Sequence, residues 1–326
     1  MELTVIIKAL NEEQKIEACI TSILREVKGL NAEVILVDSC SKDKTIEISK
    51  KYPIKIIQFK NHEDINCGAA VQLGYQVATG DYIYLIDGDM EMAEGFLKKA
   101  LVYLKSSKDT AGVSGLIKDR DLTSASDRRR KANYESITKP INSKSLGGGG
   151  LYKKIAIDDV HYFGHSALES CEELELGVRL ISRGWKLTRL PEISVYHTGH
   201  GLSDFALLLR YFKTGRFKSI GRAFKSALGK NWFWNFSKEF KYIGVAAATI
   251  FIALVNGVLS GFLNGMGAWC LINLFVWLAL SIKKRDLRDA LVSILTWYIS
   301  LSQFFVGFLS STKKPDEYIE YYLVVK

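Results

Sequence analysis

Two carboxylates at the end of an apolar run are the strongest chemical signal in the chain. Residues 82–87 read as a buried strand that ends in Asp87, and Asp89 follows after one glycine. Regular pleating stops at a strand end, so both carboxylates can point at one hard cation. Proteins hold Mg²⁺ or Mn²⁺ with one or two carboxylates together with substrate phosphates. The pair therefore predicts a metal–phosphate site, and a solvated turn is the alternative.

Two earlier apolar runs also end in polar residues. The first is followed by Asn11 and Glu12, which open a helix, and the second ends in Asp38, with Ser41 and Asp43 behind it. A carboxylate at such a strand end can accept hydrogen bonds from a nucleobase or a ribose. Ser41 and Asp43 are also typical helix caps, and capping explains them better than it explains Asp38.

The elements that must position these residues follow an α/β rhythm over about residues 1–200. Apolar runs predict strands at Leu3–Ile7, Glu33–Asp38, Ile54–Phe59 and Tyr82–Asp87. Apolar residues at three-to-four spacing predict helices at Glu12–Val27, Thr45–Lys51, Gly68–Ala78 and Glu94–Leu104. Strand–helix–strand units of this length enforce parallel pairing, and a ligand is expected at the carboxyl ends of the strands.

A later acidic helix offers a further carboxylate. Glu172, Glu175 and Arg179 share one helical face, so some of these charges are expected to pair. Glu173, at the start of the helix, is left to face the cleft.

The middle of the chain contains a basic run and a four-glycine loop. Arg128, Arg129 and Arg130 form the run, and the loop includes Gly148 and Gly149. A basic run beside a membrane-facing cleft suits a lipid phosphate, and the glycines suit a mobile loop that closes over a substrate. A solvated surface helix and an ordinary loop explain these residues equally well.

The last third of the chain has the composition of a membrane region. Residues 243–282 and 290–312 contain no charged side chain. One span needs about 20 residues, so the first run is expected to form two helices with a tight turn. The expected spans are about 243–263, 265–282 and 290–311. A buried helical hairpin of a soluble protein is the alternative.

Basic residues indicate the orientation of these spans. Residues 205–238 carry eight Lys and Arg and no acid, and a second basic cluster follows residue 282. An apolar face, a cationic face and nearby tryptophans describe helices in the headgroup layer, so membrane lipids rather than nucleic acid are the expected partner. We expect both clusters on the cytosolic side of the cell (inner) membrane, as in a multi-pass protein with a cytoplasmic catalytic domain. The third run would then leave the C-terminus outside unless it is re-entrant or interfacial, and Lys313 and Lys314 argue against an outside end.

Composition excludes several classes of protein. The 326 residues are 48% hydrophobic and 24% charged, with 4 Pro, which excludes disordered and collagen-like chains. Five Cys without a C-x-x-C pair indicate free thiols and a reducing compartment, and they exclude a cysteine zinc site. Met1 leads directly into a strand-like run, so we expect no signal peptide and a start in the cytosol.

Taken together, these residues resemble glycosyltransferase family 2, of the membrane-anchored bacterial and archaeal type, across roughly residues 3–200. The matched pattern runs in order through Asn11-Glu12-Glu13, Val37-Asp38, Gly68 to Gly74, Gly80-Asp81-Tyr82, Asp87-x-Asp89 and Glu172-Glu173. The resemblance implies the GT-A fold, a Rossmann-like mixed α/β sheet flanked by helices, here with a C-terminal helical transmembrane region. The implied organisation is a catalytic domain at 1–203, basic interfacial helices at 204–241, transmembrane helices at 242–312 and a tail at 313–326.

The resemblance also implies roles in binding the sugar donor. Asp38 is expected to hold the nucleobase, with Asn11 and Glu12 shaping its pocket and Gly68 on the same donor side. Asp87 is expected to touch the ribose or the sugar.

Further implied roles concern the chemistry. Asp89 would bind the Mg²⁺ or Mn²⁺ that bridges the diphosphate, with Asp87 and His197 completing the metal site. Glu173 lies where the family carries its general base, and Glu172 lies beside it on the acceptor side. A plain strand-end histidine is the alternative for His197.

The chain departs from the family pattern in three places. The usual Pro is replaced at Lys8 or Ala9, which suggests a change of loop geometry. The usual aspartate at the base position is Glu173, and a common Arg-Asn pair is replaced by Val71 and Gln72. Gln-x-x-Arg-Trp, typical of processive synthases, does not occur, so transfer of a single sugar is favoured.

The expected function is that of a metal-dependent inverting hexosyltransferase. It would move one sugar from a nucleotide-diphosphate sugar to the hydroxyl of a lipid-linked acceptor at the cytosolic membrane face, in cell-surface polysaccharide or glycan assembly. One alternative is a polyprenyl-phosphate glycosyltransferase, whose acceptor is the lipid phosphate. The other is a non-catalytic membrane subunit that binds nucleotide sugars.

Overall fold

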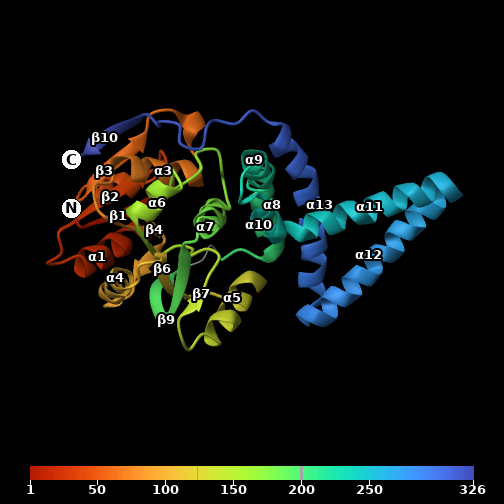
Figure 1. Ribbon diagram of the computed structural model, residues 1–326, viewed down its shortest axis with the longest axis horizontal. Helices are drawn as coiled ribbons and strands as arrows, with labels where there is room; N and C mark the ends of the chain where they lie inside the picture. The colour runs from red at the N-terminus through yellow and green to blue at the C-terminus, as the bar shows by residue number, and fades with distance from the viewer. Residues whose placement is uncertain (123, 199–200) are drawn as a thin grey trace. The chain divides into compact units, whose positions relative to one another are not determined.

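The computed structural model describes residues 1–122, 124–198 and 201–326. The chain divides into two compact units, one made of Met1–Gly201 together with Thr312–Lys326 and the other of Leu202–Ser311. The first unit thus contains both ends of the chain (Figure 1).

A mixed sheet is the centre of the first unit. Within the described residues it has ten strands, in the order β10-β3-β2-β1-β4-β8-β6-β9-β5, with β7 paired to β9. The predicted strands are present within two residues as β1 (Leu3–Ala9), β2 (Ala32–Asp38), β3 (Lys55–Phe59) and β4 (Tyr82–Asp87), and they pair in parallel as expected. The others are β5 (Met90–Met92), β6 (Thr110–Asp119), β7 (Ile141–Asn142), β8 (Gly150–Lys153), β9 (Lys186–His197) and β10 (Tyr321–Val325).

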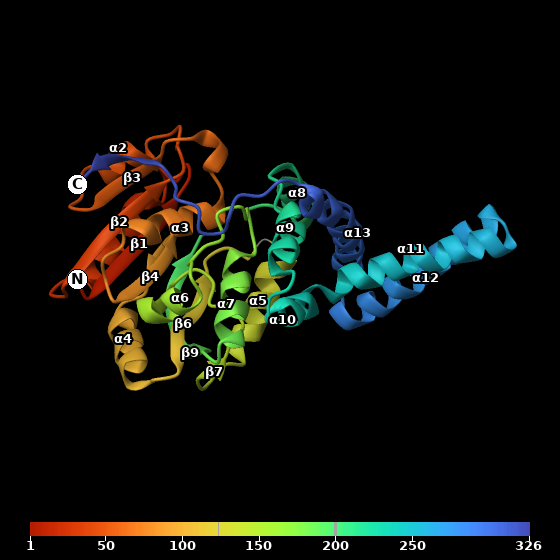
Figure 2. The ribbon, with the colours of Figure 1, turned by 45° about the horizontal axis from the view of Figure 1, so that its top comes forward.

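Helices cover both faces of this sheet (Figures 1 and 2). They are α1 (Ile16–Glu26), α2 (Thr45–Ser49), α3 (Cys67–Val77), α4 (Phe96–Ser106), α5 (Ala125–Glu135), α6 (Lys154–Asp159) and α7 (Glu172–Ser182), with a short 3₁₀ turn at His62–Asp64. Along β1, Val5 and Ile7 join the core beside α1 and α4, and Ile6 joins the core beside α3 and α7. Val5, Ile6 and Ile7 thus bury apolar side chains on both faces of β1, as a parallel strand covered on both sides requires.

Register brings the predicted polar strand ends together. Ala9 of β1 lies opposite Asp38 of β2, and Lys8 lies opposite Asp87 of β4. Since parallel strands end at the same edge, this edge of the sheet carries the predicted site.

The C-terminal segment, expected as a separate tail, adds a strand to the sheet. β10 pairs antiparallel with β3, with Tyr321 opposite Phe59 and Leu323 opposite Ile57 (Figure 1). Ile319, just before the strand, is 3% exposed and belongs to the core.

The second unit is helical. Its elements are α8 (Asp204–Lys213), α9 (Lys218–Ala227), α10 (Phe233–Ser237), a 3₁₀ turn at Lys238–Phe240, α11 (Lys241–Ser260), α12 (Phe262–Lys284) and α13 (Leu287–Leu309). Among the described residues, three helical stretches are long and apolar enough to cross a membrane: Phe233–Ser260, Phe262–Lys284 and Leu287–Leu309. α11 and α12 form a long hairpin (Figure 2) that turns at Gly261, where a φ of 102° suits glycine. The turn thus falls between the two Asn-Gly pairs of residues 256–265.

Candidate active site

The loop after β1 and the loop after β2 are joined by reciprocal hydrogen bonds. The backbone N–H of Asn11 donates to Ser41 Oγ at 2.8 Å, and Asn11 Oδ1 accepts from the N–H of Lys42 at 2.8 Å. The N–H of Glu12 donates to Thr45 Oγ1, also at 2.8 Å. Asn11 therefore shapes the loop pair, and Ser41 acts as a link between loops rather than as a helix cap.

Asp38 lies in the floor between these loops. Its Oδ2 accepts from the N–H of Ser41 and from Nε2 of Gln58, both at 2.9 Å. Its Oδ1 is buried and has no hydrogen-bond partner among the described residues. A buried, unsatisfied carboxylate oxygen costs free energy unless a ligand donates to it, so Asp38 can serve as an acceptor for a bound base.

Asp87 pairs with a lysine that the sequence analysis treated only as a loop change. Lys8 Nζ lies 3.0 Å from Asp87 Oδ1 and 3.4 Å from Glu172 Oε1, and its side chain is 12% exposed. Burial alone would lower the pKa of Lys8, but the carboxylates of Asp87, Glu172 and Glu173 raise it well above its usual value. The site thus contains a buried cation among three carboxylates.

Glu173, the predicted base, has a pKa shifted towards neutrality. Burial raises its pKa to about 7; Lys8 acts in the opposite direction, and Glu172 and Asp87 add to the increase. A Cβ built on Gly147 would lie 3.9 Å from Glu173 Oε2, and one on Gly148 would lie 3.2 Å from Asp87 Oδ2. The segment of glycines therefore lies against both carboxylates.

Close packing gives these glycines a reason other than the predicted mobility. Gly148 and Gly149 are buried, and a Cβ on Gly148 would meet Met90 Cε at 2.5 Å. A Cβ on Gly149 would meet Val195 Cγ1 at 2.7 Å. The glycines are there because backbone approaches side chains closely, and this segment is part of the packed wall of the site.

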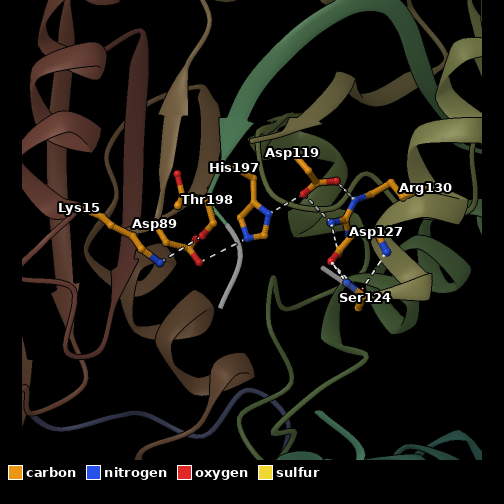
Figure 3. A network of polar contacts seen from close by, with 8 residues as sticks. All are labelled: Lys15, Asp89, Asp119, Ser124, Asp127, Arg130, His197 and Thr198. Carbon is orange, nitrogen blue, oxygen red and sulfur yellow. Dashed lines mark hydrogen bonds and ion pairs between the residues drawn. The ribbon is translucent and has the colours of Figure 1, made fainter. Parts of the chain in front are cut away.

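Asp89 and His197 form the candidate metal pair (Figure 3). His197 Nε2 lies 3.4 Å from Asp89 Oδ2, and its Nδ1 lies 2.7 Å from Asp119 Oδ1. The carboxylate of Asp119 in turn accepts hydrogen bonds from Nε and Nη2 of Arg130, at 2.8 and 2.6 Å. Burial alone would lower the pKa of His197, but the hydrogen bonds to Asp119 and Asp89 raise it to about 9.

This donor set fits a divalent cation that also binds phosphate. The described residues contain no group of three His, Cys, Asp or Glu side chains at metal-binding distances, so the chain would supply Asp89 and His197. The remaining ligands would be diphosphate oxygens and water, as is usual for Mg²⁺. Asp119 would fix the imidazole orientation, a common arrangement for ligating histidine. A bound cation would take the place of the Nε2 proton, because a ligating imidazole is neutral.

Glu12 faces the same acidic group from the other loop. Burial, with Asp89 adding to it, raises the pKa of Glu12 to about 7, and Lys15 lies 4.0 Å from its carboxylate. Glu12 therefore lies near Asp89 of the candidate metal pair as well as beside the predicted nucleobase pocket.

The other predicted site residues lie further from this group. Gly68 lies in α3 and packs against the 164–168 loop, where a Cβ would meet the carbonyl oxygen of His165 at 2.1 Å, so close packing accounts for this glycine. Arg128 and Arg129 are exposed on α5, and Arg130 is bound to Asp119. The structure thus connects the basic run to the metal pair through Arg130.

Three residues that form contacts in this site were not identified as site residues from the sequence. Lys8 was noticed only as a replaced proline, and Gln58 and Asp119 were not singled out. Asp119 ends β6 and lies opposite His197 in β9, a register that only the assembled sheet reveals.

The mixed sheet with helices on both faces and an acidic site at the carboxyl ends of its strands is the GT-A fold of nucleotide-sugar glycosyltransferases. The family model described as glycosyl transferase family 2 matches residues 4–167, half of the chain. The chain belongs to this family and is a transferase.

Curated relatives match over a shorter region. The chain is 31% identical to a dolichol-phosphate mannosyltransferase of Pyrococcus furiosus over 122 residues, which cover 36% of this chain and 34% of that protein. It is 30% identical to an uncharacterized glycosyltransferase of Haemophilus influenzae over 27% of this chain and 29% of that protein. The chain therefore spans about a third of the length of the curated relatives it matches.

Solved structures share the fold. The mannosyltransferase PcManGT of Pyrobaculum calidifontis, in complex with GDP-Man and Mn²⁺, matches with a TM-score of 0.60 at 16% identity, over 92% of this chain and 87% of that one. TarS 1-349 of S. aureus, in complex with UDP-GlcNAc, matches with a TM-score of 0.54 at 15% identity, over the full length of both chains.

Proposed function

We propose that this protein is a metal-dependent inverting glycosyltransferase that moves a single sugar from a nucleotide-diphosphate sugar to a lipid-linked acceptor hydroxyl. The observation that carries the proposal is that three features converge at one edge of the sheet. They are the buried hydrogen-bond acceptor Asp38, the Asp89–His197 pair and the carboxylate of Glu173. These are the groups needed to hold a base, to bind a diphosphate through a cation and to take a proton.

The roles of the residues follow from their positions. Asp38 Oδ1 would accept from the nucleobase, and Asp87 would contact the ribose or sugar from its position beside Lys8. Asp89 and His197 would hold a Mg²⁺ or Mn²⁺, which would supply Lewis-acid assistance to the departing nucleoside diphosphate. Mn²⁺ and GDP-Man in the complex of PcManGT support this choice of ligands.

Glu173 would start the transfer on the acceptor side. With a pKa of about 7 it can take the proton of an acceptor hydroxyl near neutral pH. That oxygen then attacks the anomeric carbon from the face opposite the leaving group, which inverts the configuration. Lys8 holds Asp87 and Glu172 in place and prevents the carboxylates from repelling one another.

A second acceptor is supported by a specific observation. The similarity to a dolichol-phosphate mannosyltransferase favours a polyprenyl phosphate, whose oxygen is already ionised. Such an acceptor needs no proton abstraction, so Glu173 would be dispensable for that reaction.

We also place the protein in the membrane, with the first unit in the cytoplasm. The three long apolar helices and the basic residues 205–238 support membrane lipids as partners.

The test is release of nucleoside diphosphate from a panel of nucleotide sugars by purified protein in detergent, with Mn²⁺ and with either alcohol-type or phosphate-type lipid acceptors. We expect release to require one particular donor, the metal and an acceptor with a free hydroxyl. We expect a Glu173→Gln variant to lose this release. Full activity of this variant with a polyprenyl phosphate would instead establish the second reaction.

A further inference from the structure

The flanks of the helical unit restrict how it can meet a bilayer. The chain enters this unit after β9 and leaves it before β10, and both strands belong to the same sheet. A mixed sheet with exposed loops does not exist within hydrocarbon, because its polar backbone would be unsatisfied there. Both flanks are therefore on one side of the bilayer, and Leu202–Ser311 must cross it an even number of times.

The return of the C-terminal segment to the sheet rests on several contacts. Gln76 Nε2 donates to the Ile319 carbonyl at 3.1 Å, and Gln76 Oε1 accepts from the Ile319 N–H at 3.0 Å. Ser166 Oγ donates to the Lys314 carbonyl at 2.7 Å. Together with the β3–β10 ladder, these contacts fix the segment from Lys314 onward to the first unit.

The α11–α12 hairpin is suited to crossing. Residues 243–282 contain no charge, and the large apolar side chains around the turn are 64% to 85% exposed: Leu254, Val258, Leu259, Phe262 and Leu263. So many adjacent exposed apolar side chains at a helix tip are not tolerated in water. The hairpin supplies two crossings, which leaves none for α13.

Both ends of α13 are flanked by basic residues, which are typical of the cytosolic face of a membrane. Lys283, Lys284 and Arg285 precede it, and Lys313 and Lys314 follow it. Basic residues of short loops concentrate on the cytosolic side, so a crossing by α13 would place one of these clusters on the wrong side.

The last turns of α13 pack against a basic helix of the same unit. A Cβ on Gly307 would meet the Lys218 carbonyl oxygen at 2.0 Å, and Lys225 Nζ donates to the Ser310 carbonyl at 2.8 Å. Arg222 Nε lies 3.3 Å from Ser310 Oγ. The C-terminal end of α13 is therefore held beside the cationic side chains of α9.

α13 itself is one-sided. Its large exposed apolar residues recur at helical spacing: Leu287, Leu291, Leu295, Phe305, Val306 and Leu309. The opposite side is buried and includes Asp289, Ser300 and Gly307. The helix has the lowest mean hydropathy of the three candidates, 1.6 against 2.1 and 1.8. A single apolar stripe on a less hydrophobic helix is typical of a helix that lies along an interface.

We propose that α11 and α12 cross the bilayer as a hairpin and that α13 lies in the headgroup layer on the side that holds the ten-stranded sheet. The partner of the α13 stripe is thus the lipid interface. This inference does not depend on the reaction proposed above.

The first test follows the two chain ends in sealed proteoliposomes. Full-length protein carries one epitope tag before Met1, a second after Lys326 and, in a separate version, a third in the turn at Gly261. Protease is added outside, and chains that retain the N-terminal tag are recovered. In the version without the turn tag, we expect these chains to retain the C-terminal tag. In the version with the turn tag, we expect a cut at the turn that leaves the N-terminal and C-terminal tags on two separate protected fragments. Loss of the C-terminal tag, or survival of the turn tag, would overturn the proposal.

The second test measures the depth of α13 directly. Spin labels are placed at Leu295→Cys, near the middle of α13, and at Phe251→Cys in α11 as the matched control. Cys40, Cys67, Cys171 and Cys270 are replaced by serine, whereas Cys19 is fully buried and is retained. Collision with oxygen and with a water-soluble relaxation agent should place Leu295 at headgroup depth and Phe251 in the hydrocarbon. Equal depths would show that α13 spans.

Discussion

Lys8 Nζ lies 3.0 Å from Asp87 Oδ1, across the register that joins β1 to β4. This pair ties the end of the first strand to the acidic strand end and also reaches Glu172. Lys8 is the buried cation of the site, and it opposes the rise in the pKa of Glu173 that burial causes.

Replacing Lys8 by methionine should weaken the base without removing it. Methionine keeps most of the length of the lysine side chain but not its charge, so Asp87 and Glu172 lose their counter-charge and the pKa of Glu173 should rise further. We expect the rate at pH 7 to fall about tenfold and the rising limb of the pH profile to move to higher pH. The Lys8→Arg variant, which keeps the charge, should retain the wild-type limb. An unshifted profile in Lys8→Met would show that the cation does not act on Glu173.

The pH dependence of kcat/KM should report Glu173. Burial raises its pKa to about 7, and a base works only when deprotonated, so the rate should fall about tenfold per pH unit below that value. Lys8, Glu172, Asp87 and Arg189 are the charged groups that act on it. Glu173→Gln should lower the rate with a hydroxyl acceptor by about 10²–10⁴ and abolish this limb, whereas Glu173→Asp should keep it. A limb that persists in Glu173→Gln would assign the base elsewhere.

Asp119 should control metal affinity through His197. Asp119→Asn weakens the partner of the imidazole Nδ1, which lies 2.7 Å away, so we expect Mn²⁺ affinity to fall about 10–100-fold. Mn²⁺ binding in the presence of nucleoside diphosphate is measured by electron paramagnetic resonance, which does not require turnover. Asp127→Asn, on α5 and bound to Arg130 rather than to His197, is the matched control and should bind Mn²⁺ as the wild type does. Equal losses in both variants would indicate a general disturbance of α5.

Asp38 should determine nucleotide affinity. Asp38→Asn replaces an acceptor by a donor at one oxygen position, so the affinity for the donor nucleotide should fall about 10–100-fold, as expected for a hydrogen bond to a charged group. Calorimetric titration with the nucleoside diphosphate measures this effect, with the exposed Asp121→Asn as control. Unchanged affinity would remove Asp38 from the base pocket.

The local sequence pattern predicted much of this fold, but contacts between residues far apart in the sequence could not be predicted. The first four strands lie within two residues of their predicted bounds, because apolar runs bounded by polar turns leave little choice of alignment. Asp38 and Asp87 lie at the same edge, on either side of β1, because parallel strands end at one edge. The Lys8–Glu172 contact joins residues 164 positions apart, and the β3–β10 pairing depends on the antiparallel return of a chain that first passes through three long helices. Neither relationship leaves a periodic trace in the sequence.

The glycine loop illustrates a different limit. Four consecutive glycines are compatible with mobility and with tight packing alike. Only the positions of Met90 and Val195 show that side chains occupy the space a Cβ would need.

Sugar transfer into lipid is the most direct test of the central proposal. Membranes that contain the wild-type protein, the Asp89→Asn variant or the Glu173→Gln variant are supplied with radiolabelled nucleotide sugar and Mn²⁺, and the label in the lipid fraction is measured. We predict that label enters lipid only with the wild type, only with the metal, and with inverted configuration at the anomeric carbon. Equal transfer by Asp89→Asn, or transfer that continues after the metal is chelated, would contradict the account.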